Sequence, residues 1–326
     1  MLKTISVIFL ISVIFLSCSK SKPIEPDQKT LKGAKFIRLA ALEKAGFEHI
    51  SPTTFLMLFL PGKTYILNRK DRLIVRFNGE KSERSYQAAG RGPGEMTHPS
   101  SIFLFDEKTI AVHAAMKSAI LFFDLDLNFK NEIRIEPSIR KINRSDNGLI
   151  AFGDYGENVF AKLNNTGKII TTFGKMHLNT KFKEVFKPSM FMGYLLENNE
   201  VVNTTWLHLN PICKIDIMDA VKMKVIASFT WDHPSPPTQK SIKTKRNFYS
   251  NYYIGKHGDY YVVNCSFSKN LGGRRLSDLK LFHKNGKRVD FDFDFKIIFS
   301  RSADANTKIY YMDDDEDISF IDLAKL

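Results

Sequence analysis

The sequence has little cysteine, glycine or proline for its length: 3 Cys, 18 Gly and 12 Pro occur among 326 residues. Three cysteines cannot build the dense disulfide framework of small secreted domains. The low glycine and proline contents exclude collagen-like and low-complexity chains. Hydrophobic residues make up 43% of the chain and charged residues 25%, which is the composition of a folded protein with a substantial core.

Long apolar runs are also absent, with one exception at the N-terminus. Ile5–Leu16 is apolar apart from two serines, and it follows the basic residue Lys3. At twelve residues it is shorter than the roughly 20 that a membrane-spanning helix needs. A basic residue followed by an apolar run of this length is typical of a secretory signal peptide. We therefore predict a signal peptide over residues 1–17 and no transmembrane helix elsewhere.

The apolar run ends at a cysteine. Phe15–Cys18 (FLSC) resembles the lipobox of bacterial lipoproteins, in which the cysteine becomes the lipidated first residue of the mature chain. The resemblance implies lipidation of Cys18 and a lipid-anchored place in the bacterial cell envelope, at the outer membrane. An ordinary cleaved signal peptide, or an N-terminal anchor with an incidental cysteine, is the alternative. Residues 18–32 are polar and contain two prolines, which predicts a flexible tether.

The chain is strongly basic, with 48 Lys and Arg against 35 Asp and Glu and a net charge of +13. This balance suggests nucleic acid, an anionic membrane or a polyanionic glycan as partner. Export of the chain argues against nucleic acid. Basic residues concentrate in an insertion near 233–251 and in a second segment soon after it. We expect either a polyanion-docking surface or a solubilising loop there, formed by Lys243, Lys245, Arg246, Arg274 and Arg275.

The rest of the chain reads as repeated β-structure. Short runs rich in Ile, Val, Phe and Tyr are separated by Gly, Asn and Asp, and Leu39–Phe47 is the best helical pattern. An apolar strand that ends in a turn recurs every 39 to 67 residues, close to the roughly 40–50 residues of a four-stranded propeller blade. The six anchors of this repeat are Phe77, Phe123, Leu163, Ile215, Phe282 and Ile321.

Six anchors predict an all-β fold, a six-bladed β-propeller over residues 33–326. The sixth anchor, Ile321, lies five residues before Leu326, the last residue of the sequence. The segment after it is too short for an outer strand, so we expect the final blade to lack one. Ala34–Leu39 supplies a spare strand at the start of the body. We expect the ring to be closed by pairing of this N-terminal strand with the last blade, which removes two exposed sheet edges. A pair of β-sandwich domains is the structural alternative.

One motif resembles a known family. Gly90–Met96 (GRGPGEM), followed by Pro99 and two strands, is similar to the lead into a blade in six-bladed β-propeller lipoproteins of Bacteroidetes-type bacteria, which are TolB-like or NHL-like propellers. The resemblance implies this fold and an envelope location. It implies no catalytic residue.

Individual site candidates follow from position and chemistry. Inner strands of propellers face the central channel, so Arg91, Glu95 and His98 are expected to bind a ligand at the channel mouth; a tight turn is the structural alternative. Asp313, Asp314 and Asp315 could ligate Ca²⁺, but their spacing is not that of an EF-hand, and a solvated hairpin tip is favoured. The eight histidines show no zinc-binding spacing. We expect no metal and no cofactor.

Cys213 and Cys265 remain after lipidation of Cys18 and fall in different predicted blades. They form either a disulfide, which requires their Cα atoms to lie within about 7 Å, or two buried thiols.

The predicted function is that of a non-catalytic binding or scaffold module in the envelope, with a protein or glycan as partner. A glycan lyase or hydrolase with a site in the channel is the alternative. A third interpretation is an accessory lipoprotein that docks on anionic lipid or polysaccharide through its basic insertion.

Overall fold

The computed structural model describes residues 34–146, 148–175, 192–196, 199–204, 212–232, 250–268, 275–291, 296–297, 299–302, 308–313 and 315–323. The predicted signal peptide, Cys18, the tether and most of the basic insertion lie outside the described residues. So do Lys243, Lys245, Arg246, Arg274, Asp314 and the side chain of Arg275. Among the described residues, no helix has the length and apolar character needed to cross a bilayer.

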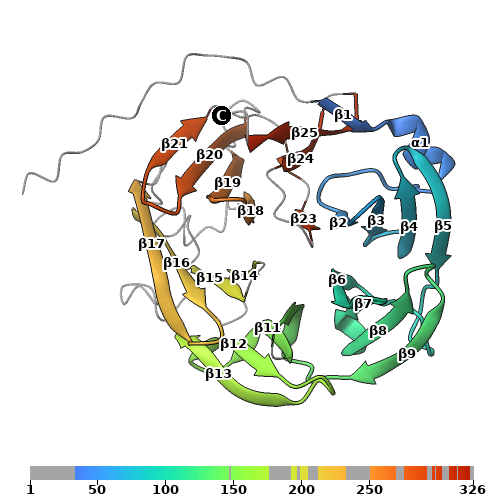
Figure 1. Cartoon of the computed structure of the whole chain (residues 1–326), viewed down its shortest axis with the longest axis horizontal. Coiled ribbons are helices and arrows are strands. Elements are labelled where there is room, and N and C mark those ends of the chain that lie inside the picture. The colour runs from blue at the N-terminus through green and yellow to red at the C-terminus, as the bar shows by residue number, and fades with distance from the viewer. Residues whose placement is uncertain are drawn as a thin grey trace, which may run out of the picture.

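Six sheets follow one another around a central axis (Figure 1), and we call them blades 1 to 6. Blade 1 contains β2 (Phe55–Leu60), β3 (Lys63–Asn68), β4 (Leu73–Asn78) and β5 (Lys81–Gln87). Blade 2 contains β6 (Pro99–Asp106), β7 (Thr109–Ala114), β8 (Ala119–Asp124) and β9 (Phe129–Arg134). Blade 3 contains β10 (Ile139–Ser145), β11 (Gly148–Tyr155), β12 (Asn158–Leu163) and β13 (Ile169–Lys175). This is the all-β, six-bladed architecture that the repeat predicted.

Blades 4 to 6 complete the arrangement. Blade 4 contains β14 (Met192–Leu195), β15 (Glu200–Thr204), β16 (Ile212–Asp219) and β17 (Lys224–Asp232). Blade 5 contains β18 (Ser250–His257), β19 (Tyr260–Ser268), β20 (Arg275–His283) and β21 (Arg288–Phe291). Blade 6 contains β22 (Lys296–Ile297), β24 (Lys308–Met312), β25 (Ile318–Asp322) and β1 (Ala34–Ile37). In the described part of the chain, α1 (Leu39–Lys44) is the one α-helix, as its pattern predicted.

All six anchors of the sequence repeat lie on the third of the four strands named above for each blade. In blade 4 the anchor was placed three residues too early. Ile215 is on β16, but the residue that precedes the turn, as Phe77 and Phe123 do in blades 1 and 2, is Met218. Ile215-Asp216 imitates the apolar-then-acidic ending of the repeat inside a longer strand.

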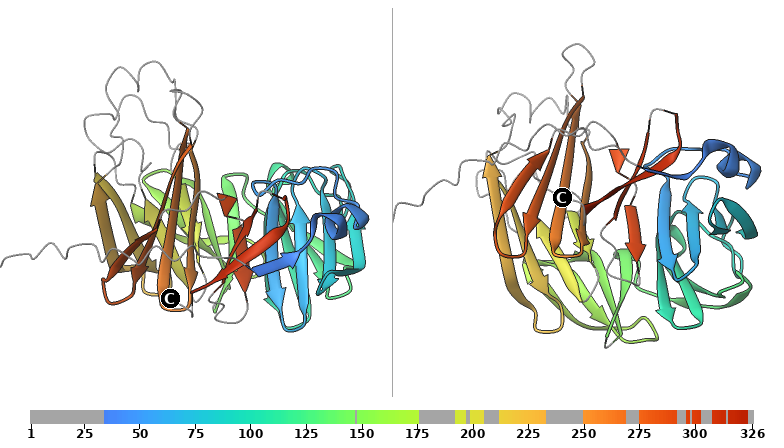
Figure 2. Two further views of the ribbon diagram at one scale, coloured as in Figure 1. Left: turned by 90° about the horizontal axis from the view of Figure 1, so that it is seen from above. Right: turned by 45° about the horizontal axis from the view of Figure 1, so that its top comes forward.

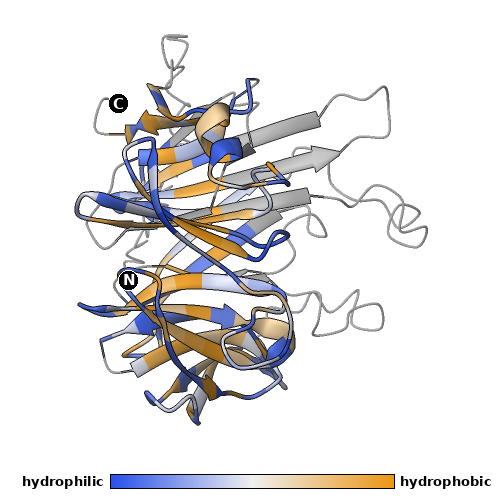
Figure 3. Cartoon of the chain, turned by 90° about the vertical axis from the view of Figure 1, so that its right-hand side faces the viewer, coloured by the Kyte–Doolittle hydropathy of each residue, from blue (hydrophilic) through white to orange (hydrophobic). Residues whose placement is uncertain are grey.

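The strands run across the thickness of the ring, so their turns gather at its two ends (Figure 2). At one end, which we call the hairpin end, lie the turns between first and second strands and between third and fourth strands. At the other, the connection end, lie the loops between second and third strands and the connections from blade to blade. Hydrophobic residues concentrate in the strands and hydrophilic residues at the turns (Figure 3).

The core is divided into separate layers, each between two neighbouring blades. Both faces of a blade are buried, so a strand such as β8 (AILFFD) is apolar on every residue but the last. Leu121 and Phe123 pack toward blade 1, while Ile120 and Phe122 pack toward blade 3. Corresponding layers lie between blades 3 and 4, 4 and 5, and 6 and 1.

Polar side chains also cross the blade boundaries. Arg76 in blade 1 donates to Asp126 Oδ1 in blade 2 at 2.5 Å. Ser101 Oγ in blade 2 accepts from the Ile142 amide in blade 3 at 3.2 Å. Glu200 in blade 4 pairs with Lys256 in blade 5 at 2.7 Å. These contacts fix the rotation of each blade relative to the next, which apolar packing alone does not specify.

Blade 1 carries a fifth strand that the sequence did not predict. β23 (Phe299–Ser302) comes from the C-terminal part of the chain and pairs in parallel with β2, with Leu56 opposite Phe299. It lies nearest the centre of the ring (Figure 1). The inner edge of β2 is therefore occupied by backbone from the other end of the chain.

The N-terminal strand lies at the outside of blade 6. β1 pairs antiparallel with β25, with Ala34 opposite Phe320 and Ile37 opposite Ile318. Phe36 packs edge-on against Tyr310 of β24 at 5.2 Å and against Phe59 of β2 at 5.8 Å, measured between ring centroids. β1 is thereby packed against both blade 6 and blade 1.

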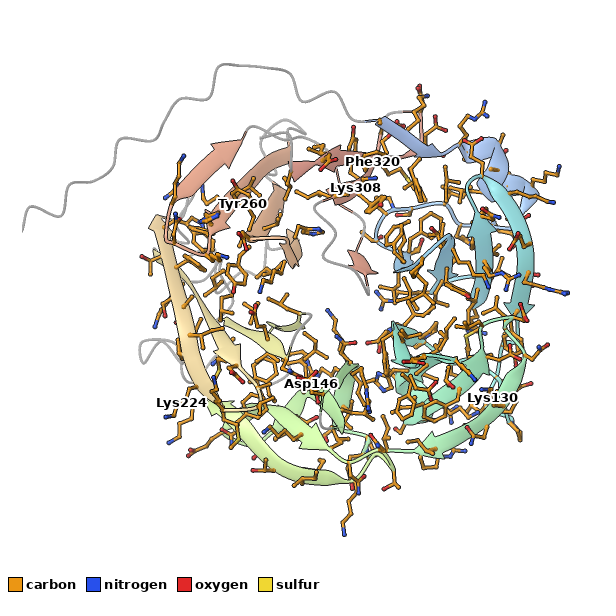
Figure 4. All side chains as sticks on the ribbon, in the orientation of Figure 1. Lys130, Asp146, Lys224, Tyr260, Lys308 and Phe320 are labelled. Carbon is orange, nitrogen blue, oxygen red and sulfur yellow. The ribbon has the colours of Figure 1, made fainter. Side chains whose placement is uncertain are left out.

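An acidic turn holds this segment in place. Asp317 Oδ2 accepts from Lys35 Nζ at 2.6 Å, and its Oδ1 accepts from the Leu39 amide at the start of α1 at 2.7 Å. Asp315 also contacts Lys35, at 3.2 Å. The hydrogen bonds that Lys35 donates to Asp317 and Asp315 raise the pKa of Lys35 to about 12. On the same blade, Lys308 Nζ stands 4.2 Å from the ring centroid of Phe320 (Figure 4).

The Asp317→Asn substitution is expected to lower the free energy of unfolding by about 2 kcal/mol at pH 7, because a charged acceptor loses its bonds to Lys35 and Leu39. Burial acts to raise the pKa of Asp317, but hydrogen bonds from Lys35 and Leu39 hold it below its usual value. Its contribution is therefore present above pH 4 and disappears as the pH falls through the lowered pKa. Chemical denaturation across pH 7 to pH 3 measures both effects.

Asp315→Asn is the matched control. The Asp315 side chain is 76% exposed, against 8% for Asp317, so its loss is expected to change stability by less than about 0.5 kcal/mol. Equal effects of the two substitutions would contradict the assignment.

Candidate functional site

The glycine-rich motif forms a small closed loop between β5 and β6. The Met96 amide donates to the Ala88 carbonyl at 2.8 Å, and Ala89 and Met96 form a parallel bridge, so these residues close the neck of the loop. Met96 is fully buried in the layer between blades 1 and 2. The loop is thus anchored in the core by its last residue.

The glycines make room for the carboxylate of Glu95. Its Oε2 accepts from the Gly92 amide at 2.5 Å. A Cβ atom at Gly90 would overlap this carboxylate, and one at Gly92 would lie 2.9 Å from it. Gly90 also has a φ of +144°, which other residues rarely adopt. An amide that could have bound an external anion is therefore occupied by the protein's own side chain.

A buried ion pair fastens the loop to blade 2. Lys117, at the end of η1 (Ala115–Lys117), pairs with Glu132 on β9 and donates to the Gly92 carbonyl at 2.5 Å. Glu132 in turn accepts from the Gly94 amide at 3.1 Å. The side chains of Lys117 and Glu132 are 1% and 17% exposed. Burial acts to raise the pKa of Glu132, but hydrogen bonds from Lys117 and Gly94 hold it below its usual range.

The location of this loop differs from the expected one for Arg91 and Glu95. Gly94 accepts a bond from Tyr86 on β5 at 3.1 Å and donates to Glu132 on β9, so the loop lies against the outer strands of two blades rather than near the axis. Arg91 is exposed there, and Glu95 is turned into the loop. The bonds that hold the loop are formed by residues distant in sequence, which the motif could not reveal.

His98 has a different position, directly before the inner strand β6. Its φ is +54°, and its carbonyl accepts from the Ala115 amide at 3.2 Å. Partial burial, together with the charges of Arg69 and Arg72, lowers the pKa of His98 below its usual value. His98 is therefore close to two guanidinium groups from the β3–β4 turn.

We call Arg69, Arg72 and His98 the basic cluster. Arg69 Nε donates to the Pro99 carbonyl at 3.0 Å, which ties the β3–β4 turn of blade 1 to the start of blade 2. His98 is exposed, and Arg69 and Arg72 are half-buried. Guanidinium groups recognise carboxylates and phosphates through paired hydrogen bonds. The cluster can therefore bind an anionic group at the connection end, near the inner strand.

Two acidic groups have metal-like spacing, but their oxygens already have partners. In the first, Asp71 accepts from the amides of Glu48 and His49 at 3.0 and 3.1 Å and bonds the His49 ring. In the second, formed by Asp313, Asp315 and Asp317, the ammonium of Lys35 contacts two of the three carboxylates. Asp313 caps its own turn by accepting from the amides of residues 315 and 317.

One pair has the composition of a nucleophile and its base. Ser100 Oγ lies 2.7 Å from His113 Nδ1. His113 is fully buried, its Nε2 has no hydrogen-bond partner, and burial lowers its pKa to about 4. The neutral imidazole of His113 is enclosed in the core of blade 2 and has no contact with solvent.

Cys213 and Cys265 lie on different sheets. Cys213 is on β16, opposite Trp231, and Cys265 is on β19, opposite Tyr252 and Asp278. Their side chains are outside the described residues.

Comparison with protein families assigns the chain to one of them. Residues 25–271 match the model of the DUF5128 family, described as a 6-bladed beta-propeller. The chain belongs to this family. A comparison with curated proteins found no significant match.

Solved structures with the same fold include three with TM-scores above 0.5. An exported protein of Bacteroides fragilis is 16% identical, with a TM-score of 0.56, over 82% of this chain and 88% of that one. A DUF4221 protein of Bacteroides vulgatus is 9% identical, with a TM-score of 0.52, over 82% and 91%. The hydrazine synthase of Kuenenia stuttgartiensis is 11% identical, with a TM-score of 0.53, over 82% and 76%. At these identities the likeness concerns the fold.

The buried ion pair generates a prediction for this propeller. Lys117→Met is expected to lower the free energy of unfolding by about 3 kcal/mol, because Glu132 and the Gly92 carbonyl are left without their cation. Adding Glu132→Gln should recover part of the loss, which a double-mutant cycle by chemical denaturation would measure. Lys130→Met is the control, because Lys130 is exposed and lies on β9, the strand that carries Glu132. It should have little effect on the free energy of unfolding. Additive losses for residues 117 and 132 would refute the coupling.

Proposed function

We propose that this propeller is a lipid-anchored protein of the bacterial cell envelope that binds an anionic group on a protein or glycan partner without catalysing a reaction. The basic cluster is the observation that carries this proposal. It presents Arg69, Arg72 and His98 at the connection end of the ring, on backbone fixed by the bond from Arg69 to Pro99. Its residues lie in short segments that directly adjoin strands, so little backbone has to be ordered when a ligand binds.

The location is supported by the N-terminal sequence. Lys3, the apolar run and Cys18 have the order of a lipoprotein signal, and the polar residues 18–32 provide a tether. The similar protein of Bacteroides fragilis is described as exported. We infer that this chain is likewise exported and that a lipid on Cys18 keeps it at the membrane.

We also infer that β1 closes the ring. Its pairing with β25, the contact of Phe36 with blades 6 and 1, and the bonds of Asp317 to Lys35 and Leu39 support this role. The loss of stability expected for Asp317→Asn is a test of it, since ring closure makes the whole propeller depend on this contact.

Cys18→Ser is expected to abolish acylation and the salt-resistant membrane retention that depends on it. In a bacterium with lipoprotein processing, the unaltered chain should incorporate labelled fatty acid and stay with membranes washed at high salt, because acylation needs the thiol. The variant should remain unlabelled and be released by the high-salt wash. Cys213→Ser is the control and should behave as the unaltered chain. Labelled fatty acid on the Cys18 variant would exclude this anchor.

Arg72→Glu is expected to weaken partner binding by about 10- to 100-fold, because a charge-assisted bond is replaced by repulsion. The measurement is cross-linking and affinity capture of the anchored protein in its own envelope, with quantification of the captured partner. Lys108→Glu makes the same charge change at the β6–β7 turn, at the hairpin end, and should leave capture unchanged. Arg91→Glu tests the exposed arginine of the glycine-rich loop separately.

Undiminished capture by the Arg72 variant would remove the basic cluster from the proposal. Release of new reducing ends from an envelope glycan by the unaltered protein would instead support the glycan lyase or hydrolase alternative.

A further inference from the structure

Exposed apolar side chains gather on one hairpin of blade 4. Four of the six large exposed apolar residues in the described part of the chain belong to it. These are Val221 (38% exposed), Met223 (42%), Val225 (51%) and Ile226 (50%), at the turn between β16 and β17 and the start of β17. We call residues 221–226 the blade 4 tip. Exposed apolar groups that adjoin one another mark surfaces that contact something else.

A comparison between blades shows that the fold does not require an apolar residue at the start of the fourth strand. In blades 1 to 4 the fourth strand has a register shift at its start, which leaves one bulged residue. That residue is Glu83 in blade 1 and Lys130 in blade 2, both exposed and charged. In blades 3 and 4 it is Ile170 and Ile226, which are 64% and 50% exposed. The bulge itself accepts a charge, so the fold does not require isoleucine there.

The backbone at the tip carries strain that a glycine would remove. Met223 has a φ of +55°, in the left-handed region. The turns of blades 3 and 5 place Gly167 and Gly286 in that region, and the turn of blade 2 uses Leu127, which is buried. Met223 combines the unfavourable backbone with an exposed side chain. An apolar side chain is therefore present where local structure favours its absence.

The tip is held in one conformation by bonds from its flanks. Asp219 Oδ1 accepts from the amides of Val221 and Lys222 at 2.8 and 2.9 Å. Lys162 of blade 3 donates to the Val221 carbonyl at 2.8 Å. The apolar side chains are therefore presented on a fixed backbone that needs no ordering when a ligand binds.

Lysines alternate with the apolar residues. Lys222 and Lys224 are exposed between Val221, Met223 and Val225. Lys222 contacts Asp219 at 3.6 Å, and Lys224 lies on the outer rim of the ring (Figure 4). Apolar side chains flanked by lysines are suited to an anionic bilayer surface, since the apolar groups enter the interface while the ammonium groups meet the headgroups.

The tip and the start of β1 lie at the same end of the ring. β16 and β25 are both third strands and run in the same direction. The tip follows the end of β16, and Ala34, where the tether of the proposed lipoprotein arrives, pairs with Phe320 near the end of β25. The hairpin end therefore carries both the tip and the start of the propeller body, and the basic cluster lies at the opposite end.

We propose that the blade 4 tip is a second membrane contact, which inserts Val221 and Met223 shallowly into an anionic bilayer surface and binds its headgroups through Lys222 and Lys224. The biological role of this contact rests on the proposed lipid anchor, because the anchor brings the hairpin end to the bilayer. Two points of attachment would hold the ring with its connection end turned outward.

The test uses the chain with Cys18→Ser, so that binding does not depend on acylation. Flotation is measured with vesicles of equal parts phosphatidylglycerol and phosphatidylcholine, and with phosphatidylcholine alone. The Cys18→Ser protein should float with the anionic vesicles at low salt. Adding Val221→Ser and Met223→Ser should reduce the floated fraction at least fivefold, and Lys222→Gln with Lys224→Gln should remove the preference for anionic lipid.

Met116→Ser is the matched control, because Met116 is 61% exposed but lies in η1, at the connection end. It should float as the Cys18→Ser protein does. Thermal unfolding confirms that each variant is folded, as expected for exposed positions. Failure of the Cys18→Ser protein to float, or equal flotation of the tip variants, would overturn the proposal. A dimer in sedimentation that the tip variants dissociate would assign the tip to a second copy. These outcomes are independent of the fatty-acid labelling that tests the anchor.

Discussion

Each of blades 1 to 4 packs against a neighbouring blade on both of its faces. A sheet buried on both sides has no solvent-facing register, which is why β8 can be apolar at five of its six positions. Leu121 and Phe123 would be exposed without blade 1, and Ile120 and Phe122 without blade 3. The hydrophobic effect is non-directional, so it accounts for the stacking of the blades but not for their rotation about one another. That rotation is fixed by bonds such as those from Arg76 to Asp126 and from Ile142 to Ser101.

Several titratable groups serve this architecture, among them Glu95, which the sequence had suggested as a ligand-binding residue. Glu95 fills its own glycine loop, Lys117 and Glu132 tie that loop to blade 2, and Asp317 holds β1 and α1. The basic cluster differs, because His98 is exposed, and Arg69 and Arg72 are half-buried beside the start of an inner strand. In the proposed arrangement the two ends of the ring have separate tasks. The hairpin end meets the membrane, and the connection end meets the partner.

The sequence allowed the fold to be predicted because its repeat is written in short-range patterns. An apolar strand ending at Phe77 or Phe123, followed by a turn, is visible without knowledge of the neighbours. The site was less predictable because it depends on distant residues. Nothing near Gly90 shows that Lys117 will reach the Gly92 carbonyl, and β23, only four residues long, pairs with a strand from the other end of the chain. In the sequence, the apolar residues of the blade 4 tip resemble those of a buried strand. Their exposure results from the bulge and the turn, which the sequence alone does not reveal.

The parallel pairing of β23 with β2 has a consequence for how the protein folds. Leu56 on β2 can pair with Phe299 on β23 only after residue 299 has been synthesised. The sheet of blade 1 is therefore complete only when nearly the whole chain has been made. β1 depends in the same way on β25. Contacts between residues so far apart in sequence slow folding, because a long loop must close before they form. An N-terminal blade that cannot be completed early keeps the chain unfolded for longer, which is compatible with the export proposed for this protein.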